Sequence, residues 1–255
     1  MDVKRVYINS NKRDVGGTDE SFTVSKVSTM FERIPRRVKL LKAKIPFTWD
    51  NITTSNNKFS IIESGPTTIP ITIATGHYTG ATLADAVQAA MNLVGGQTYT
   101  VVYDPNTFTF QISSASPFQL DFTVDDSMAS SLGFTNIITT SSTELTSPNV
   151  AILQPDTEVF ISSNLISGID NGVVPWFSGS TSDFHILGII PMVTPFGSLI
   201  DYEAKKEEPY LNISQSEFAK LQNTNYSLSF TLFFLSGIPI NLRGAHWSAE
   251  LLFEF

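Results

Sequence analysis

The chain has 255 residues, of which 42% are hydrophobic, so it can bury a substantial core in one large domain or two smaller ones. Charged residues make up only 16%, and Cys is absent, which excludes disulfides and thiolate metal sites. The low charge and the abundance of β-branched, aromatic and hydroxyl side chains favour a β-dominated protein. Such a surface is expected either to meet other protein or to be an ordinary Ser/Thr-rich β surface, and composition leaves both open.

Targeting signals are not apparent in the sequence. No apolar run approaches the roughly 18 residues that indicate a transmembrane helix. The N-terminal stretch MDVKRVYINSNKRD lacks the apolar segment of a secretory signal, so we expect synthesis without a signal peptide.

Charge is distributed unevenly along the chain. The formal net charge is −8, but residues 1–44 carry +6 and residues 45–255 carry −14. This asymmetry predicts that the basic end meets an acidic partner, either nucleic acid or protein. The alternative is a strand with a solvated basic face, on which Arg37, Lys39 and Lys44 lie off the apolar positions of Val38 and Leu40.

The predicted elements begin with strands at residues 3–9 and 22–24, followed by a longer strand that ends near Pro46. Residues 64–146 have a different pattern. A helix is predicted at about 82–94, because its apolar side chains recur at helical spacing, with Thr82 near its start and Gly95 as its stop. The apolar positions of this helix are Leu83, Ala86, Val87, Ala90, Met91 and Val94.

A hairpin at about 98–113 follows the helix, with the turn Asp-Pro-Asn-Thr between two alternating arms. From residue 149 onward the pattern is again that of short strands. The last of them alternates with Leu252 as the only exception, and Trp247, Leu251 and Phe255 lie on its apolar face. About eight strands outside the central block suit a β-sandwich or jelly roll.

The expected fold is therefore all-β dominated: a single jelly roll, in the form of a β-sandwich or barrel, with an inserted small α+β domain. We assign residues 1–63 and 147–255 to the jelly roll and residues 64–146 to the insertion. The first and last strands must share a sheet, because neither set is sufficient alone.

Catalytic and metal-binding patterns are lacking. His77, His185 and His246 have no carboxylate or second His at metal-ligand spacing. Adjacent acids at 125–126 and 207–208 are interpreted as a helix cap and a solvated loop. A basic segment followed by aromatic residues is only a faint match to a nucleic-acid-binding surface, and the acidic remainder argues against one. We therefore expect a protein that is not an enzyme and uses no cofactor or metal.

Several segments, taken in order, resemble the penton (minor capsid) proteins of virophages and polinton-like viruses. They are YINSNKRD, VKLLKAKIPFTWDNI, GHYTGATLADAVQAAMN, YTVVYDPNTFTFQI and GIPINLRGAHWSAELLFEF. The resemblance implies a structural capsid protein of the virion, a homopentamer at the fivefold vertices of an icosahedral capsid, with the insertion domain facing outward. The implied partners are further copies of the chain and the capsomers of a major capsid protein around the vertex.

The basic N-terminal part would then face the capsid interior, toward genomic DNA or an internal lining. The residues predicted to make such interior or partner contacts are Lys4, Arg5, Lys12, Arg13, Arg36 and Arg37. The first alternative is a β-sandwich attachment or carbohydrate-binding module of a viral spike or fibre, for which Trp176 is the predicted exposed aromatic. The second alternative, a hydrolase on a jelly roll, requires acids that face each other across a cleft.

Overall fold

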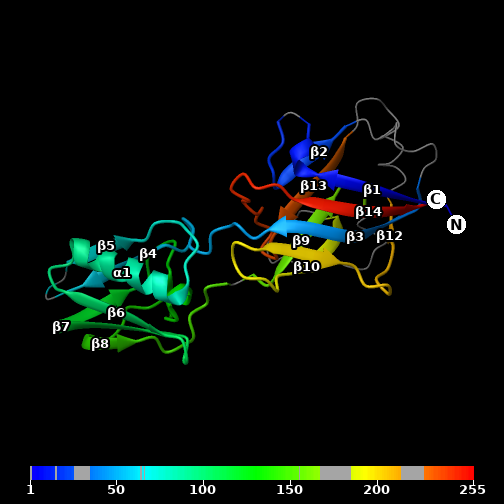
Figure 1. The fold of residues 1–255 in the computed structure, drawn as a ribbon. Coiled ribbons are helices and arrows are strands. Elements are labelled where there is room, and N and C mark those ends of the chain that lie inside the picture. The colour runs from blue at the N-terminus through cyan, green and yellow to red at the C-terminus, as the bar shows by residue number, and fades with distance from the viewer. Residues whose placement is uncertain are drawn as a thin grey trace. The chain divides into compact units, whose positions relative to one another are not determined.

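The structure is a computed structural model of the chain. It describes residues 2–14, 16–25, 35–63, 65, 67–154, 156–166, 185–213 and 227–255. Two compact units are present (Figure 1): the first combines Met1–Trp49 with Asp156–Phe255, and the second is the continuous segment Asp50–Pro155. In the described ranges, no helix has both the length and the apolar composition needed to cross a membrane.

The first unit consists of two antiparallel sheets that share one apolar core. One sheet has the strand order β1-β14-β3-β11, with β12 also paired to β3, and the other has the order β10-β9-β13-β2. The first sheet contains β1 (Val3–Asn9), β3 (Arg37–Pro46), β11 (Leu199–Glu203), β12 (Leu211–Asn212) and β14 (Ser248–Glu254). The second contains β2 (Ser21–Val24), β9 (Glu158–Ser163), β10 (Ile186–Pro191) and β13 (Leu228–Phe233), and a 3-10 turn η1 (Ser10–Lys12) follows β1. This arrangement confirms the β-dominated class and agrees with a jelly roll.

β14 is an interior strand of its sheet, paired antiparallel with β1 on one side and β3 on the other. Its apolar side chains Leu251 and Phe253 are fully buried, as the alternating pattern predicts. Trp247, just before the strand, is also in the core. Phe255 is only partly buried, because it packs at the margin of that core, where its N–H donates to the carbonyl of Asp2 at 3.1 Å.

A bulge in β3 allows one strand to bury apolar residues of both parities. Opposite β14, the pairing skips Leu41, which is an extra residue relative to the partner strand. Since each residue in a strand faces the opposite side from the next, one extra residue reverses which positions face inward. The buried positions before and after the bulge are Val38, Leu40, Ala43 and Ile45. Lys42 and Lys44 are thereby turned outward, where both form ion pairs with acidic side chains.

The second unit has a sheet in the order β5-β4-β7-β6, with β8 also paired to β7, and the helix α1 packed on β5 and β6. Its elements are β4 (Lys58–Ile62), β5 (Thr68–Thr72), α1 (Gly80–Val94), β6 (Tyr99–Asp104), β7 (Thr109–Asp121), α2 (Ala129–Leu132) and β8 (Ser142–Thr146). The apolar face of α1 predicted from the sequence supplies Leu83, Val87 and Met91 to a core that is separate from that of the first unit.

The boundaries 64–146 predicted for the inserted domain are too narrow. β4 lies before the predicted start, yet it pairs with β5 and β7 of the second unit. Residues after the predicted end also belong to this unit: Ser147 donates its N–H to the carbonyl of Phe110, and Ala151 donates to Phe108, both at 2.8 Å. A strand pattern shows that a strand exists but not which strand pairs with it, so the sequence could not place these segments.

The start of α1 also differs from the sequence expectation. The helix begins at Gly80, and its N-cap is Thr79 rather than Thr82. Thr79 accepts the N–H of Thr82 on its hydroxyl (3.2 Å), and Thr82 in turn accepts the N–H of Thr79 (2.9 Å). The two threonines thus form a reciprocal capping box in which Thr occupies the position usually held by Glu or Gln.

Candidate interaction surfaces

Of the six basic residues predicted to contact a partner, Lys4, Arg5, Lys12 and Arg36 are exposed. Arg5, Arg13 and Arg37 form intramolecular ion pairs. These pairs are Arg5–Glu250 (3.2 Å), Arg13–Asp19 (2.6 Å) and Arg37–Glu254 (2.5 Å). Two of these three pairs use acids near the C-terminus of the sequence, Glu250 and Glu254, whereas Asp19 belongs to the N-terminal segment itself.

The four long strands of the first sheet each carry charges of a single sign. β1 and β3 contain only basic charged residues, whereas β14 and β11 contain only acidic ones. Because the strand order is β1-β14-β3-β11, the signs alternate across the sheet. Two further cross-strand pairs join β3 to β11: Lys42–Glu203 at 3.1 Å and Lys44–Asp201 at 3.7 Å. Basic and acidic strands are therefore neighbours throughout this path of the sheet, although each exposed pair is worth only about 0–1 kcal/mol.

The expected solvated basic face of β3 is wrong at Lys39. The side chain of Lys39 is buried, with 7% of its surface exposed. Its ammonium donates to three backbone carbonyls of one turn, those of Lys205 (2.9 Å), Lys206 (3.3 Å) and Glu208 (2.8 Å). Three donors thus meet three acceptors, which satisfies the group that burial would otherwise leave without hydrogen bonds. Lys39 holds the turn after β11 against the sheet.

The same turn is held a second time by Tyr202, whose hydroxyl donates to the carboxylate of Glu208. Burial, helped by the neighbouring negative charge, raises the pKa of Tyr202 above its ordinary value. The phenol therefore stays protonated and remains a donor to Glu208. Glu208 is thus a structural acceptor in this turn, and its carboxylate also accepts the N–H of Lys205 at 3.1 Å.

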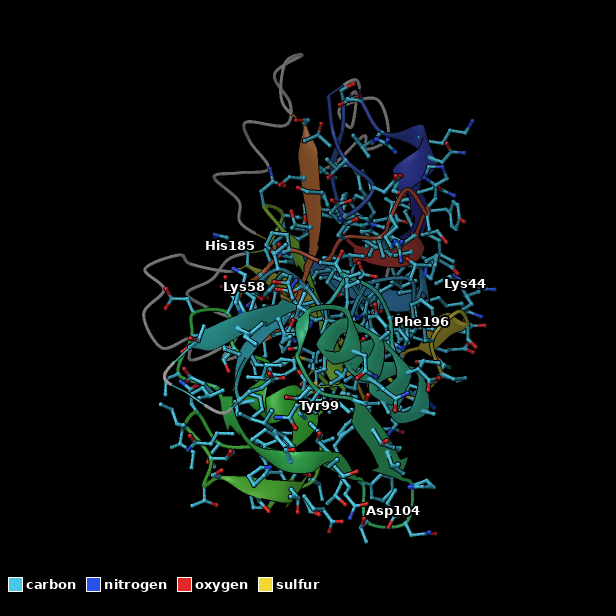
Figure 2. All side chains as sticks on the ribbon, turned by 90° about the vertical axis from the view of Figure 1, so that its left-hand side faces the viewer. Lys44, Lys58, Tyr99, Asp104, His185 and Phe196 are labelled. Atoms are coloured by element: carbon cyan, nitrogen blue, oxygen red, sulfur yellow. The ribbon has the colours of Figure 1, made fainter. Side chains whose placement is uncertain are left out.

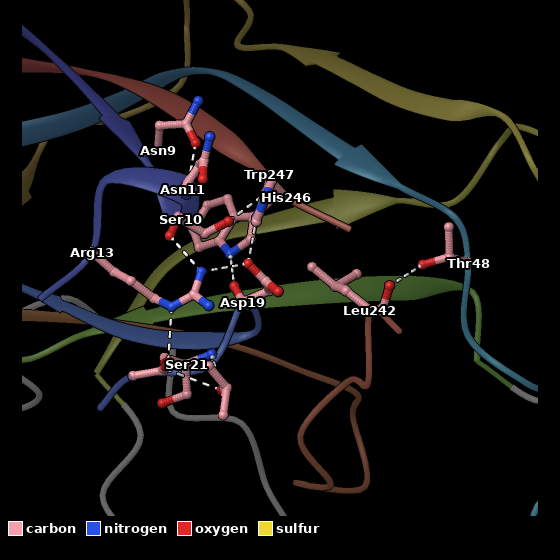
Figure 3. Close-up of polar contacts among 12 residues, drawn as sticks. Asn9, Ser10, Asn11, Arg13, Asp19, Ser21, Thr48, Leu242, His246 and Trp247 are labelled. Carbon is pink, nitrogen blue, oxygen red and sulfur yellow. Dashed lines mark hydrogen bonds and ion pairs between the residues drawn. The ribbon is translucent and has the colours of Figure 1, made fainter. Parts of the chain in front are cut away.

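Asp19 connects the loop after β1 to the start of β14 (Figure 3). Its carboxylate accepts hydrogen bonds from Arg13 (2.6 Å) and contacts the Nδ1 of His246. Its backbone carbonyl accepts the indole N–H of Trp247 at 2.8 Å. Trp247 is in turn joined to Ser10 by two bonds of 3.0 Å, one to the Ser10 hydroxyl and one from the Ser10 N–H. His246 and Arg13 thus have structural partners in this loop.

The tryptophans in the described part of the chain do not form an exposed aromatic surface that could bind a carbohydrate. Trp49 and Trp247 are buried, at 6% and 1% exposure. Trp49 packs against Phe47, with 4.4 Å between ring centroids, and against Phe234 at 5.6 Å. Trp176, the predicted exposed aromatic, lies outside the described residues.

The second unit is strongly acidic. It contains eight Asp and Glu residues and a single basic residue, Lys58, so its formal charge is −7 of the chain's −8. Lys58, which is labelled in Figure 2, pairs with Asp126 at 2.7 Å. The charge asymmetry of the sequence therefore becomes an asymmetry between the units, since the first unit is close to neutral.

Groups of His, Asp and Glu that would suit a metal ion are not found among the described residues. Of the adjacent acids, Asp126 pairs with Lys58 and Glu208 accepts from Tyr202. The short helix α2 has Met128, not Asp126 or Ser127, as its N-cap, while the hydroxyl of Ser127 accepts the N–H of Ala129 at 3.3 Å.

Both open flanks of the first unit contain hollows lined by apolar side chains. The β1–β2 flank, where the edge strands β1 and β2 lie, has a hollow of about 230 Å³ lined by Val6, Ile8, Val24 and Phe253 among others. The β10–β11 flank on the other side has a hollow of about 510 Å³, and residues that line it include Leu40, Ile186, Gly188, Ile200 and Leu211. These flanks are the candidate surfaces for contact with other protein.

Comparison with solved structures identifies the architecture. The crystal structure of the mavirus penton protein matches with a TM-score of 0.55 and 14% sequence identity, covering 99% of this chain and 98% of that chain. The chain has the fold of the mavirus penton protein. The penton fold that its sequence motifs predict is thereby confirmed.

A second match is a chain in the cryo-EM structure of the Sputnik virophage, with a TM-score of 0.47, 14% identity, and coverage of 100% of this chain and 98% of that chain. No family model and no curated protein matches the sequence. The sequence did not predict the burial of Lys39, the contacts of Asp19 or the two flank hollows. Each of them brings together residues far apart in the chain, and no local pattern signals them.

Proposed function

We propose that the chain is a structural capsid protein that forms a homopentamer at the fivefold vertices of an icosahedral virion. The observation that carries this proposal is the match of nearly the whole chain, both units included, to the fold of a penton protein. The two apolar flank hollows support it, because a ring of jelly rolls needs one flank of each copy to contact a flank of the next. The capsomers of a major capsid protein around the vertex would be the other partners.

In this proposal the second unit faces outward. Its support is electrostatic: a segment with a formal charge of −7 and one basic residue, itself paired, is best placed where water and counterions surround it. A position close to encapsidated DNA would bring like charges together. Contact of the basic N-terminal part with DNA or an internal lining would involve the six predicted basic residues, of which Arg5, Arg13 and Arg37 also form ion pairs within the chain.

No described tryptophan favours the alternative of a carbohydrate-binding module, because Trp49 and Trp247 are core residues. The virion is the proposed location, with the chain made in the host cell without a signal peptide. An enzymatic role has no support from the fold, whose solved counterpart is a penton protein.

The test is the mass of the purified chain by light scattering, together with negative-stain images. We expect five times the chain mass of 28.0 kDa and five-membered rings. A monomer or a twofold dimer over the whole accessible concentration range would contradict the proposal.

A further inference from the structure

Phe108 ends the turn between β6 and β7 in a backbone conformation that aromatic residues rarely adopt. Its φ is +57°, in the left-handed region that Gly and Asn adopt most easily. Two backbone hydrogen bonds of 2.8 Å hold it there: its N–H donates to the carbonyl of Asp104, and its own carbonyl accepts the N–H of Ala151. The neighbouring segments therefore fix the turn, and a phenylalanine at this position adds strain that Gly or Asn would avoid.

Burial does not compensate for this strain, because 54% of the Phe108 side chain is exposed. The same hairpin contributes other side chains to the core of the second unit, namely Tyr99, Val101, Phe110 and Ile112. A left-handed, exposed phenylalanine is thus neither required by the turn nor used by the core. Strain that is kept at such a position is typical of residues that contact another molecule.

The segment after β8 adds two further exposed apolar side chains beside this turn. It alternates in burial: Ala151 and Leu153 pack against the core, whereas Val150 and Ile152 are 57% and 47% exposed. The bond from Ala151 to Phe108 holds the segment next to the turn. We call Phe108, Val150 and Ile152 the hairpin patch. Exposed apolar side chains gathered in this way indicate a protein contact surface.

The charge around the hairpin patch restricts the class of partner. The patch belongs to the second unit, whose formal charge is −7. Asp104, labelled in Figure 2, begins the same turn. Hydrogen bonds from the N–H of Asn106 and the hydroxyl of Thr107 lower the pKa of Asp104, so its carboxylate is ionised. A negative unit repels nucleic acid and anionic membranes, and it attracts a basic surface.

We propose that the hairpin patch is a docking site for a basic protein segment that carries apolar side chains of its own, with Phe108 as the anchor. The partner is a protein other than this chain, because the second unit of another copy would bring a further charge of −7. Apolar contact with Phe108 supplies affinity, and the acidic unit supplies attraction and orientation. Every residue of the patch lies in the second unit, so this inference and the proposed pentamer can fail independently.

The test uses synthetic peptides as probes, titrated with the full chain and followed by fluorescence anisotropy. The first peptide is an amphipathic sequence of Lys and Leu. The second has Ser in place of Leu, and the third has Glu in place of Lys. We expect the Lys/Leu peptide to bind, more weakly as salt is raised, and the other two to bind at least about tenfold more weakly.

Phe108→Asn is the decisive variant, because Asn tolerates the left-handed backbone and lacks the ring. We expect it to bind the Lys/Leu peptide at least about tenfold more weakly. The melting temperature of the second unit should be unchanged or a few degrees higher, because strain is relieved.

Leu93→Gln is the matched control, since Leu93 is an exposed apolar residue near the end of α1. Its neighbour Asn92 is hydrogen-bonded to Tyr99, at the end of β6 far from the turn. This variant should bind the Lys/Leu peptide as the unsubstituted chain does.

Each of the following outcomes overturns the inference. A lower melting temperature of the second unit in Phe108→Asn shows that the ring supports the fold. Equal peptide binding by Phe108→Asn and the unsubstituted chain shows that Phe108 is not the anchor. Equal binding of the Lys/Ser and Lys/Leu peptides shows that charge alone acts, and no binding of the Lys/Leu peptide up to about 1 mM shows that the patch is not a docking site. A change in the mass of the chain by light scattering in Phe108→Asn shows that another copy covers the patch.

Discussion

Val3 and Glu254 face each other across the β1–β14 ladder, so strands from the two ends of the printed sequence are antiparallel neighbours. β14 also pairs with β3, and its removal would leave two strands without their shared partner. The first unit is therefore completed only by its last segment.

Deletion of Leu251–Phe255 is expected to abolish cooperative unfolding of the first unit. The deletion removes two fully buried side chains, each worth about 2–5 kcal/mol, from a unit whose total stability is on the order of 5–15 kcal/mol. Differential scanning calorimetry should show one remaining transition, from the second unit with its separate core. Leu252→Ala, at a partly exposed position of the same strand, is the control and should retain both transitions. A truncated chain with the full-length melting profile would show that β14 is dispensable.

Lys39→Met is expected to lower the free energy of unfolding by about 1–3 kcal/mol, because three carbonyls lose their common donor. Urea unfolding followed by intrinsic fluorescence measures this change. The control is Lys42→Met on the same strand, which loses only an exposed ion pair at 3.1 Å and should change stability by less than about 1 kcal/mol. Equal effects of the two substitutions would argue that the turn at 205–208 does not depend on Lys39.

Tyr99 is expected to make the stability of the second unit depend on pH in the alkaline range. Its hydroxyl donates to Glu63 at 2.8 Å, and burial, followed by this hydrogen bond and the charge of Glu63, raises its pKa above the ordinary value of 10.0. A raised pKa in the folded state means that the unfolded chain ionises first as pH rises. The protonated Tyr99 hydroxyl therefore contributes fully to the free energy of unfolding below about pH 10. This contribution is lost as pH rises from that value toward the pKa of the folded state.

Tyr99→Phe should therefore flatten the fall in stability above about pH 10 while costing about 1 kcal/mol near neutral pH, where the bond to Glu63 is lost. Denaturant unfolding at a series of pH values measures both effects. Tyr7→Phe, at an exposed position, is the control. An unchanged alkaline slope in Tyr99→Phe would mean that other groups dominate this pH range.

Gly133→Ala is expected to destabilise the second unit severely, and Gly197→Ala is the matched control. Both glycines have left-handed backbones, with φ of +76° and +81°. An added Cβ at Gly133 would lie 2.2 Å from the carbonyl oxygen of Asn149, whereas none of the described atoms lies within 4 Å at Gly197. The control should cost about 1 kcal/mol from backbone strain alone, and Gly133→Ala should cost several times more, measured by thermal unfolding. Similar costs would show that the segment around Asn149 yields easily.

Much of the architecture follows from local patterns in the sequence. The alternation in β14 predicts which of its side chains are buried, and the spacing of Leu83, Val87 and Met91 predicts the buried face of α1. Period-two and period-3.6 patterns report burial directly, because the side chain's direction is set by the backbone. The ordered motifs, which resemble those of penton proteins, also predict the fold.

Other features depend on pairings that the sequence does not display. The burial of Lys39 results from a turn 166 residues further along the chain. Lys42 and Lys44 are turned outward by a bulge at Leu41, which a regular alternation does not reveal. The sequence left open whether the basic segment meets an acidic partner or is one face of a strand, because nothing local shows that β3 lies between two acidic strands.

The division of the chain also fixes the order in which its parts become able to fold during synthesis. The second unit is continuous, so all of its partners have left the ribosome once residue 155 has emerged. The basic strands β1 and β3 must wait for their acidic partners β11 and β14, which are made after the second unit. In that interval the nascent chain carries apolar strands and an uncompensated positive charge next to a finished acidic domain. The continuous second unit can therefore complete its core while the strands that close the sandwich have yet to be made.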